Sequence, residues 1–149
     1  MAKGPPKTVS LAHDDHHARF VGRTADGRQF FLTTPFVPAF GGDAGREFVA
    51  LYIFDKDGVL LDAQIEDLGT RAEMDEAAAR ARHAALLESL GPVKYRKIKV
   101  APFKIERFGV VFGFIPQPPD EEIEDWSVIV EPGDVMCFWP PWTSGDYDT

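Results

Sequence analysis

Residues 47–66 read EFVALYIFDKDGVLLDAQIE and predict a β-hairpin, the unit from which we expect the whole fold to be built. Two apolar-rich runs, 47–54 and 59–66, flank the turn Asp55-Lys56-Asp57-Gly58, whose glycine takes the positive φ that closes such a turn. The pattern also occurs upstream, where the runs 19–24 and 28–34 flank Ala25-Asp26-Gly27. The sequence therefore predicts two antiparallel hairpins, joined by a proline- and glycine-containing loop over 34–46.

A helix is predicted over residues 71–90, directly after the second hairpin. Thr70 and Glu73 have the spacing of a capping box, and Gly91-Pro92 is a typical helix end. One face of the helix carries apolar residues and a histidine at 3/4 spacing, namely Ala79, His83, Leu86, Leu87 and Leu90. We therefore expect this face to pack on the sheet.

The second half of the chain predicts further strands. Runs 93–101 and 103–107 are separated by Pro102, which indicates an edge or a change of strand. In the run 108–114 the phenylalanines alternate with Gly109 and Gly113, over which we expect the helix to pack. A last strand pair, 126–130 and 134–139, is expected to turn at 131–133 and to close the core.

These elements predict an α+β fold, with an antiparallel sheet of successive β-hairpins (about six to eight strands) and one main α-helix, about 71–90, packed on it. Residues 1–17, with Gly4-Pro5-Pro6, predict a flexible N-terminal arm, and 18–149 a single globular domain. The single Cys137 rules out an internal disulfide and favours a buried, inert thiol. No apolar run approaches the length of a membrane span or of a secretion signal, so we expect a cytoplasmic protein without membrane contact.

Charge is distributed unevenly along the chain. Residues 120–149 hold nine acidic side chains, no Lys or Arg, and all three tryptophans, whereas residues 94–107 hold six basic side chains and one Glu. We expect the acidic ending to lie along this basic segment, with the aromatic side chains supplying most of the stabilisation, because exposed ion pairs contribute only about 0–1 kcal/mol each. This pairing, together with a net charge of −8, argues against a nucleic-acid partner.

The turn Asp55-Lys56-Asp57-Gly58 also resembles the first motif of haloacid-dehalogenase-type phosphatases, in which the first Asp attacks phosphate and Mg²⁺ screens the charge. This resemblance covers only residues 53–62. It makes a small Mg²⁺-dependent phosphohydrolase that uses Asp55 and Asp57 the alternative function. Aspartate-rich turns ending in glycine are also what ordinary hairpins use, and the later motifs of those enzymes are absent from the sequence.

Two sets of histidines have metal-binding or catalytic chemistry. His13, His16 and His17 lie in the cluster HDDHH, which contains good metal ligands, although adjacent residues cannot all converge on one ion. His83 lies in the leucine stripe of the predicted helix, where a partly buried, hydrogen-bonded histidine is the usual outcome and a catalytic base the alternative. We therefore expect no cofactor, and keep the histidine cluster as an alternative metal site.

The ending 140–149, PPWTSGDYDT, is either a clasp across its own domain or a recognition tail, because Trp and Tyr give large contact area at low entropic cost. The clasp is the preferred interpretation. Where this region remains exposed it supplies candidate binding residues, together with the basic segment: Trp139, Trp142, Tyr147, Lys97 and Lys99.

Three stretches together resemble a small bacterial family that carries the label of formate-hydrogenlyase regulatory protein. They are Phe20-x-Gly22-x-x-Ala25-Asp26-Gly27-x-Gln29-Phe30-Phe31, Leu51-x-x-Phe54-Asp55-x-Asp57-Gly58 and Pro141-Trp142-x-x-Gly145-x-Tyr147-Asp148-Thr149. The resemblance implies regulation through binding and a structural role for the Asp55 turn, and it brings no catalytic residues with it. The predicted function is thus a non-catalytic protein-interaction or regulatory module, with a protein partner or a second copy of itself.

Overall fold

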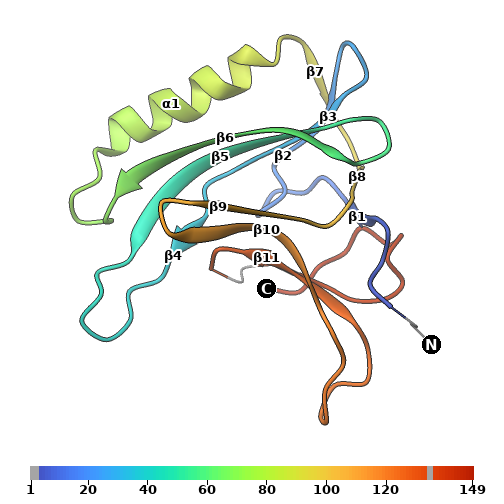
Figure 1. Ribbon diagram of the computed structural model, residues 1–149. Helices are drawn as coiled ribbons and strands as arrows, with labels where there is room; N and C mark the ends of the chain where they lie inside the picture. The colour runs from blue at the N-terminus through green and yellow to red at the C-terminus, as the bar shows by residue number, and fades with distance from the viewer. Residues whose placement is uncertain (1–3, 134–135) are drawn as a thin grey trace.

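The computed structural model describes residues 4–133 and 136–149, and over these residues it contains three antiparallel sheets and one helix (Figure 1). The largest sheet has six strands in the order β4-β5-β3-β2-β7, with β6 also paired to β5. Its strands are β2 (Phe20–Thr24), β3 (Gln29–Thr33), β4 (Phe36–Val37), β5 (Arg46–Phe54), β6 (Leu60–Gly69) and β7 (Val93–Tyr95). The second has the order β12-β11-β10-β9: β9 (Phe103–Arg107), β10 (Val110–Gln117), β11 (Ser127–Glu131) and β12 (Met136–Phe138). A third, two-stranded sheet pairs β1 (Val9–Leu11) with β8 (Ile98–Val100).

Both hairpins predicted in the first half are confirmed. In the β2–β3 hairpin Arg23 pairs with Gln29, and in the β5–β6 hairpin Phe54 pairs with Leu60 across the Asp55–Gly58 turn. The antiparallel α+β class is likewise confirmed, but the strands form two sheets that face each other instead of one. The last strand pair, β11–β12, belongs to the second sheet and closes the core from that side.

The main core lies between the two sheets. Phe31 and Tyr52 of the six-stranded sheet meet Phe103 and Phe114 of the four-stranded sheet, with ring centroids 6.1 Å apart for Phe31–Phe114 and 5.1 Å for Tyr52–Phe103. A second, smaller core lies on the opposite face of the six-stranded sheet, under the helix. Strand β5 is therefore buried on both faces, which explains its continuous apolar run from Phe48 to Phe54.

The helix α1 (Glu76–Ser89) packs on the outer face of the six-stranded sheet through Leu86 and Leu90 (Figure 1). It begins five residues later than predicted, because Asp75 caps it by accepting a hydrogen bond from Ala78 N at 3.1 Å. Only half of the predicted capping box is present, with Glu73 N donating to Thr70 Oγ1 at 3.2 Å. The Glu73 carboxylate accepts from the Thr70 hydroxyl at 2.9 Å, and these bonds close a separate turn before the helix. No helix in the described part of the chain has the length and apolar character needed to span a membrane.

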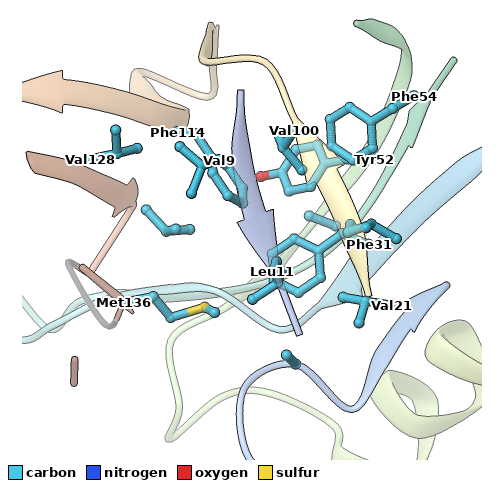
Figure 2. Packing of buried hydrophobic residues seen from close by; sticks show 14 of the residues in the cluster. Val9, Leu11, Val21, Phe31, Tyr52, Phe54, Val100, Phe114, Val128 and Met136 are labelled. Atoms are coloured by element: carbon cyan, nitrogen blue, oxygen red, sulfur yellow. The ribbon is translucent and has the colours of Figure 1, made fainter. Parts of the chain in front are cut away.

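The N-terminal segment differs from the predicted flexible arm of residues 1–17. Val9 and Leu11 are fully buried on β1, and Ala18 is also buried in the main core. Figure 2 shows that the side chains of β1 lie among those of both sheets and of β8: Phe31, Tyr52, Val100, Phe114, Val128 and Met136. The expectation failed because β1 contributes only two large apolar side chains, too few to give a sequence signal.

The glycines near 108–114 also differ from the prediction. Phe108 has φ 57° and forms the β9–β10 turn with Gly109, so the alternating strand begins only at Val110. A Cβ on Gly113 would lie 2.0 Å from the carbonyl oxygen of Phe103. The close neighbour of this glycine is thus the partner strand β9, and α1 packs on the other sheet.

Candidate functional site

The C-terminal segment 140–149 is held across the N-terminal strand. Ser10 N donates to the carbonyl oxygen of Trp142 at 2.8 Å, and Ala12 N donates to that of Gly145 at 3.0 Å. Cys137 and Asp148 exchange two further backbone hydrogen bonds of 2.9 and 2.8 Å. The half-buried side chains of Trp142 and Tyr147 pack against the main core. The segment therefore has the contacts of a clasp.

A side-chain hydrogen bond links the clasp to the N-terminal loop. The Tyr147 hydroxyl donates to the Asp14 carboxylate and accepts from His17 N at 3.2 Å. Burial raises the pKa of Tyr147 to about 12, and the Asp14 carboxylate contributes to this rise. Burial also acts to raise the pKa of Asp14, but hydrogen bonds from Tyr147 and from the backbone of His16 and Ala18 outweigh it, so that the net pKa is lowered. At neutral pH the pair is a phenol donating to a carboxylate.

The aromatic residues that were predicted to bind a partner are partly buried. Trp142 and Tyr147 pack part of their surface against the domain itself, and Trp139 is half-buried directly after β12. They remain partly accessible, so a binding role for them stays a prediction. The packing of Trp142 and Tyr147 nevertheless gives these two residues a structural reason to be present.

The basic segment, in contrast, presents its charges to solvent. Between residues 94 and 99 the exposed side chains are Lys94, Tyr95, Arg96, Lys97 and Lys99, which we call the basic surface. Ile98 and Val100 point into the core, so alternation along β8 turns Lys97 and Lys99 outward. Residues 94–99 contain no acidic side chain of their own.

The acidic ending does not pair with this surface in the predicted way. Lys97 reaches the ending through the carbonyl oxygen of Thr143, at 2.6 Å from its Nζ, and not through a carboxylate. Strand β1 lies between β8 and the clasp, because it pairs with β8 on one side and bonds to Trp142 and Gly145 on the other. The Asp120 carboxylate accepts hydrogen bonds from the backbone of its own loop, at Glu122 and Ile123. Backbone hydrogen bonds and aromatic packing thus hold residues 140–149 against the N-terminal strand and the main core.

The Asp55–Asp57 turn has a structural role. The Asp55 carboxylate accepts hydrogen bonds from Asp57 N and Val59 N, both at 2.9 Å, which is an ordinary turn-closing arrangement. The turn also docks on β8, since Ala101 N donates to the carbonyl oxygen of Gly58 at 2.9 Å. In the described part of the chain no third His, Cys, Asp or Glu joins these two carboxylates in a metal-binding group. The structure thus supplies nothing further for the phosphohydrolase alternative.

The histidine cluster is spread over separate contacts. His13 stacks on Tyr95 with ring centroids 5.3 Å apart, while His17 contacts Tyr147 with centroids 6.2 Å apart. His16 is exposed, and its backbone N–H donates to Asp14 at 2.8 Å. Over residues 4–133 and 136–149 the three side chains do not form a metal-binding group.

His83 lies half-buried at a hollow of about 390 Å³ between α1, the start of β2 and the end of β3. Its ring packs edge-on against Phe20 with centroids 4.6 Å apart. Burial lowers the pKa of His83, and the Arg19 guanidinium lowers it further, so the imidazole is neutral at pH 7. The hollow also carries the Arg71–Glu47 ion pair of 3.1 Å. These contacts account for His83 as a packing residue at the rim of the helix.

One basic residue next to the basic surface was missed by the sequence analysis. Arg23 on β2 pairs directly with Lys94 on β7, which joins segments separated by about seventy residues of chain. The residue is inconspicuous in sequence because it is one of three arginines spread along an otherwise ordinary hairpin, with Arg19 and Arg28. Only knowledge of the β2–β7 register would have identified it.

Comparison with protein-family models, with curated proteins and with solved structures finds no significant match to this chain.

Proposed function

We propose that this protein is a non-catalytic interaction module that binds an acidic protein partner through the basic surface. The observation that carries the proposal is the exposure of four cationic side chains between residues 94 and 99. The contact described above between this surface and the acidic ending goes to a backbone carbonyl oxygen and not to a carboxylate. A regulatory role, which the family resemblance implies, would be exerted through such a complex.

Electrostatics supports this choice of partner. The protein has a net charge of −8, so a local cationic surface stands out against a repulsive background and selects partners that present an acidic patch to it. The same background disfavours long polyanions such as nucleic acids, which would extend beyond the basic surface. The partner is therefore expected to be compact and locally acidic.

The basic surface also has the composition of a protein interface. Tyr95 is 43% exposed and stacked on His13, which fixes the ring at little further entropic cost on binding. Tyrosine is enriched in interface centres, and at this exposure Tyr95 offers a large aromatic contact area. Rigid β-strands on both sides hold these residues in place.

The test is recovery of a complex from extract of the native cell with tagged full-length protein. We expect Lys99→Glu to reduce the recovered partner by about tenfold or more, and Arg80→Glu on α1, an equal change of charge on the opposite side of the sheet, to leave it unchanged. Recovery should also fall with rising salt, because the interaction is electrostatic. Equal recovery with both variants, or loss of the partner on nuclease treatment, would contradict the proposal.

A further inference from the structure

A second feature lies beside the basic surface, where β2 pairs with β7. A hollow of about 330 Å³ opens there, and its lining includes Thr24, Pro92 and Val93 with three cationic residues, Arg23, Lys94 and Arg96. No acidic side chain lines it among the residues that the structure describes. The hollow is thus cationic on several sides.

The strand register forces two of these charges together. Arg23 and Lys94 are directly opposed in the antiparallel β2–β7 pair, and like charges in this position destabilise a sheet. Arg96 lies two residues beyond Lys94, so alternation places it on the same side of the chain as Lys94. Its backbone is fixed there by the hydrogen bond from Arg96 N to the carbonyl oxygen of Val21, at 3.1 Å.

The strands cannot easily separate to relieve this repulsion. Gly22, the neighbour of Arg23, lies so close to β7 that a Cβ on it would be 2.0 Å from the carbonyl oxygen of Lys94. Val93 packs in the small core under α1, which anchors the other end of β7. The packing therefore holds the backbones of Arg23 and Lys94 opposite each other whether or not an anion is present.

Arg23 also carries an unused hydrogen-bond donor. Its Nε is buried and has no hydrogen-bond partner. In the described part of the chain, no other buried side-chain nitrogen or oxygen lacks a partner. Buried donors are almost always paired in native proteins, and an unpaired one on a charged group is especially costly. A donor of this kind beside two further cations matches an acceptor with negative charge.

We propose that this hollow is a binding site for a phosphate dianion, held by Arg23, Lys94 and Arg96. A guanidinium donates two parallel hydrogen bonds to phosphate oxygens, and Lys94 adds a point charge. Two negative charges among three positive ones offset most of the repulsion between Arg23 and Lys94. A single carboxylate would leave two of the three charges uncompensated.

This site goes beyond the partner-binding proposal and does not depend on it, because a phosphate monoester can be bound by the isolated protein. The same chemistry has two sources, a free phosphate monoester and a phosphorylated residue of another chain. Methyl phosphate and a short, otherwise uncharged phosphoserine peptide distinguish them. Tighter binding of the peptide identifies a phosphorylated chain as the ligand, and equal affinity identifies the free monoester.

The experiment is calorimetric titration of the purified full-length chain with inorganic phosphate, methyl phosphate and the peptide, with ionic strength held constant by chloride. We expect saturable binding in wild type. Arg96→Gln and Lys94→Gln should each weaken it by about tenfold or more, and Lys56→Gln, an exposed cation outside the hollow, should change it by less than about twofold. No saturable binding at millimolar phosphate, or equal weakening by Lys56→Gln, would overturn the proposal.

A stability measurement without ligand separates a binding role from a merely structural one. If the opposed charges form an anion site, Lys94→Gln relieves their repulsion and should raise the melting temperature in chloride buffer. The same variant should reduce the stabilisation that phosphate gives wild type. A lowered melting temperature of ligand-free Lys94→Gln, with the phosphate response retained, would show that Lys94 supports the strand pair and binds nothing.

Discussion

Replacing Gly58 with alanine tests whether the Asp55–Gly58 turn is a structural unit docked on β8. Gly58 has φ +94°, and a Cβ placed on it would lie 2.8 Å from the carbonyl oxygen of Lys99 and 3.1 Å from Ala101 N. Gly27 occupies the same place in the first hairpin, with φ +87°, but its Cβ would enter open space. The two glycines thus share the backbone requirement and differ in the contact with β8, so Gly27→Ala is the matched control.

The expected costs follow from these two contributions. A positive φ costs a non-glycine residue about 1–2 kcal/mol, and Gly27→Ala should lose this amount alone. Gly58→Ala must also push the turn away from β8, which stretches the 2.9 Å hydrogen bond from Ala101 N to the Gly58 carbonyl oxygen and adds about 1–2 kcal/mol. For a chain of this size about 1 kcal/mol corresponds to about 3 °C. We therefore expect melting temperatures lowered by about 3–6 °C for Gly27→Ala and about 6–12 °C for Gly58→Ala.

The assay is urea and thermal unfolding followed by tryptophan fluorescence and circular dichroism on both variants. Coincident transitions from the two probes would justify two-state analysis. Equal destabilisation of the two variants would refute the reasoning, because it would mean that the turn carries no contact with β8. In that case the turn would be free to serve another purpose, and the phosphohydrolase alternative would gain support.

Three further predictions concern the clasp, the centre of the fold and the helix. Tyr147→Phe should cost about 1 kcal/mol at pH 7 in urea unfolding. Because the folded pKa of Asp14 is lowered, this difference should persist above about pH 4 and disappear as the pH falls through the folded pKa, and an equal cost below the folded pKa would contradict it. Gln29→Leu should cost about 2–4 kcal/mol, since the buried amide bonds the carbonyl oxygens of Asp55 and Lys99 at 2.9 and 3.1 Å, and a neutral effect would show these bonds to be dispensable. Leu86→Ala should cost about 2–5 kcal/mol, measured by thermal unfolding against the exposed Leu61→Ala, which should be near neutral.

The sequence was sufficient for the elements whose signals are local. Both early hairpins were predicted because a turn with glycine at positive φ lies between two apolar runs, and the structure has these runs as β2–β3 and β5–β6. The clasp was anticipated from its aromatic content, since tryptophan side chains are costly to expose. In each case the deciding residues lie within a short window of the chain.

Features that depend on distant pairing could not be predicted. β1 is a three-residue strand whose burial depends on β8 and on the clasp, about ninety and one hundred and thirty residues away. The opposite charges of the basic segment and the ending suggested direct contact, but residues 142–145 dock through backbone hydrogen bonds from Ser10 N and Ala12 N, which the charge pattern does not indicate. The Arg23–Lys94 opposition likewise exists only through the β2–β7 register.

The way the two chain ends are joined has a consequence for the basic surface. Because β1 bonds to β8 on one edge and to the clasp on the other, the ending supports β8 without covering its outward side chains. Had the acidic ending paired directly with β8, its carboxylates would have neutralised Lys97 and Lys99 within the fold. The intervening strand instead keeps β8 apart from the clasp, so Lys97 and Lys99 stay exposed on an acidic molecule, and Lys97 meets the clasp at the carbonyl oxygen of Thr143.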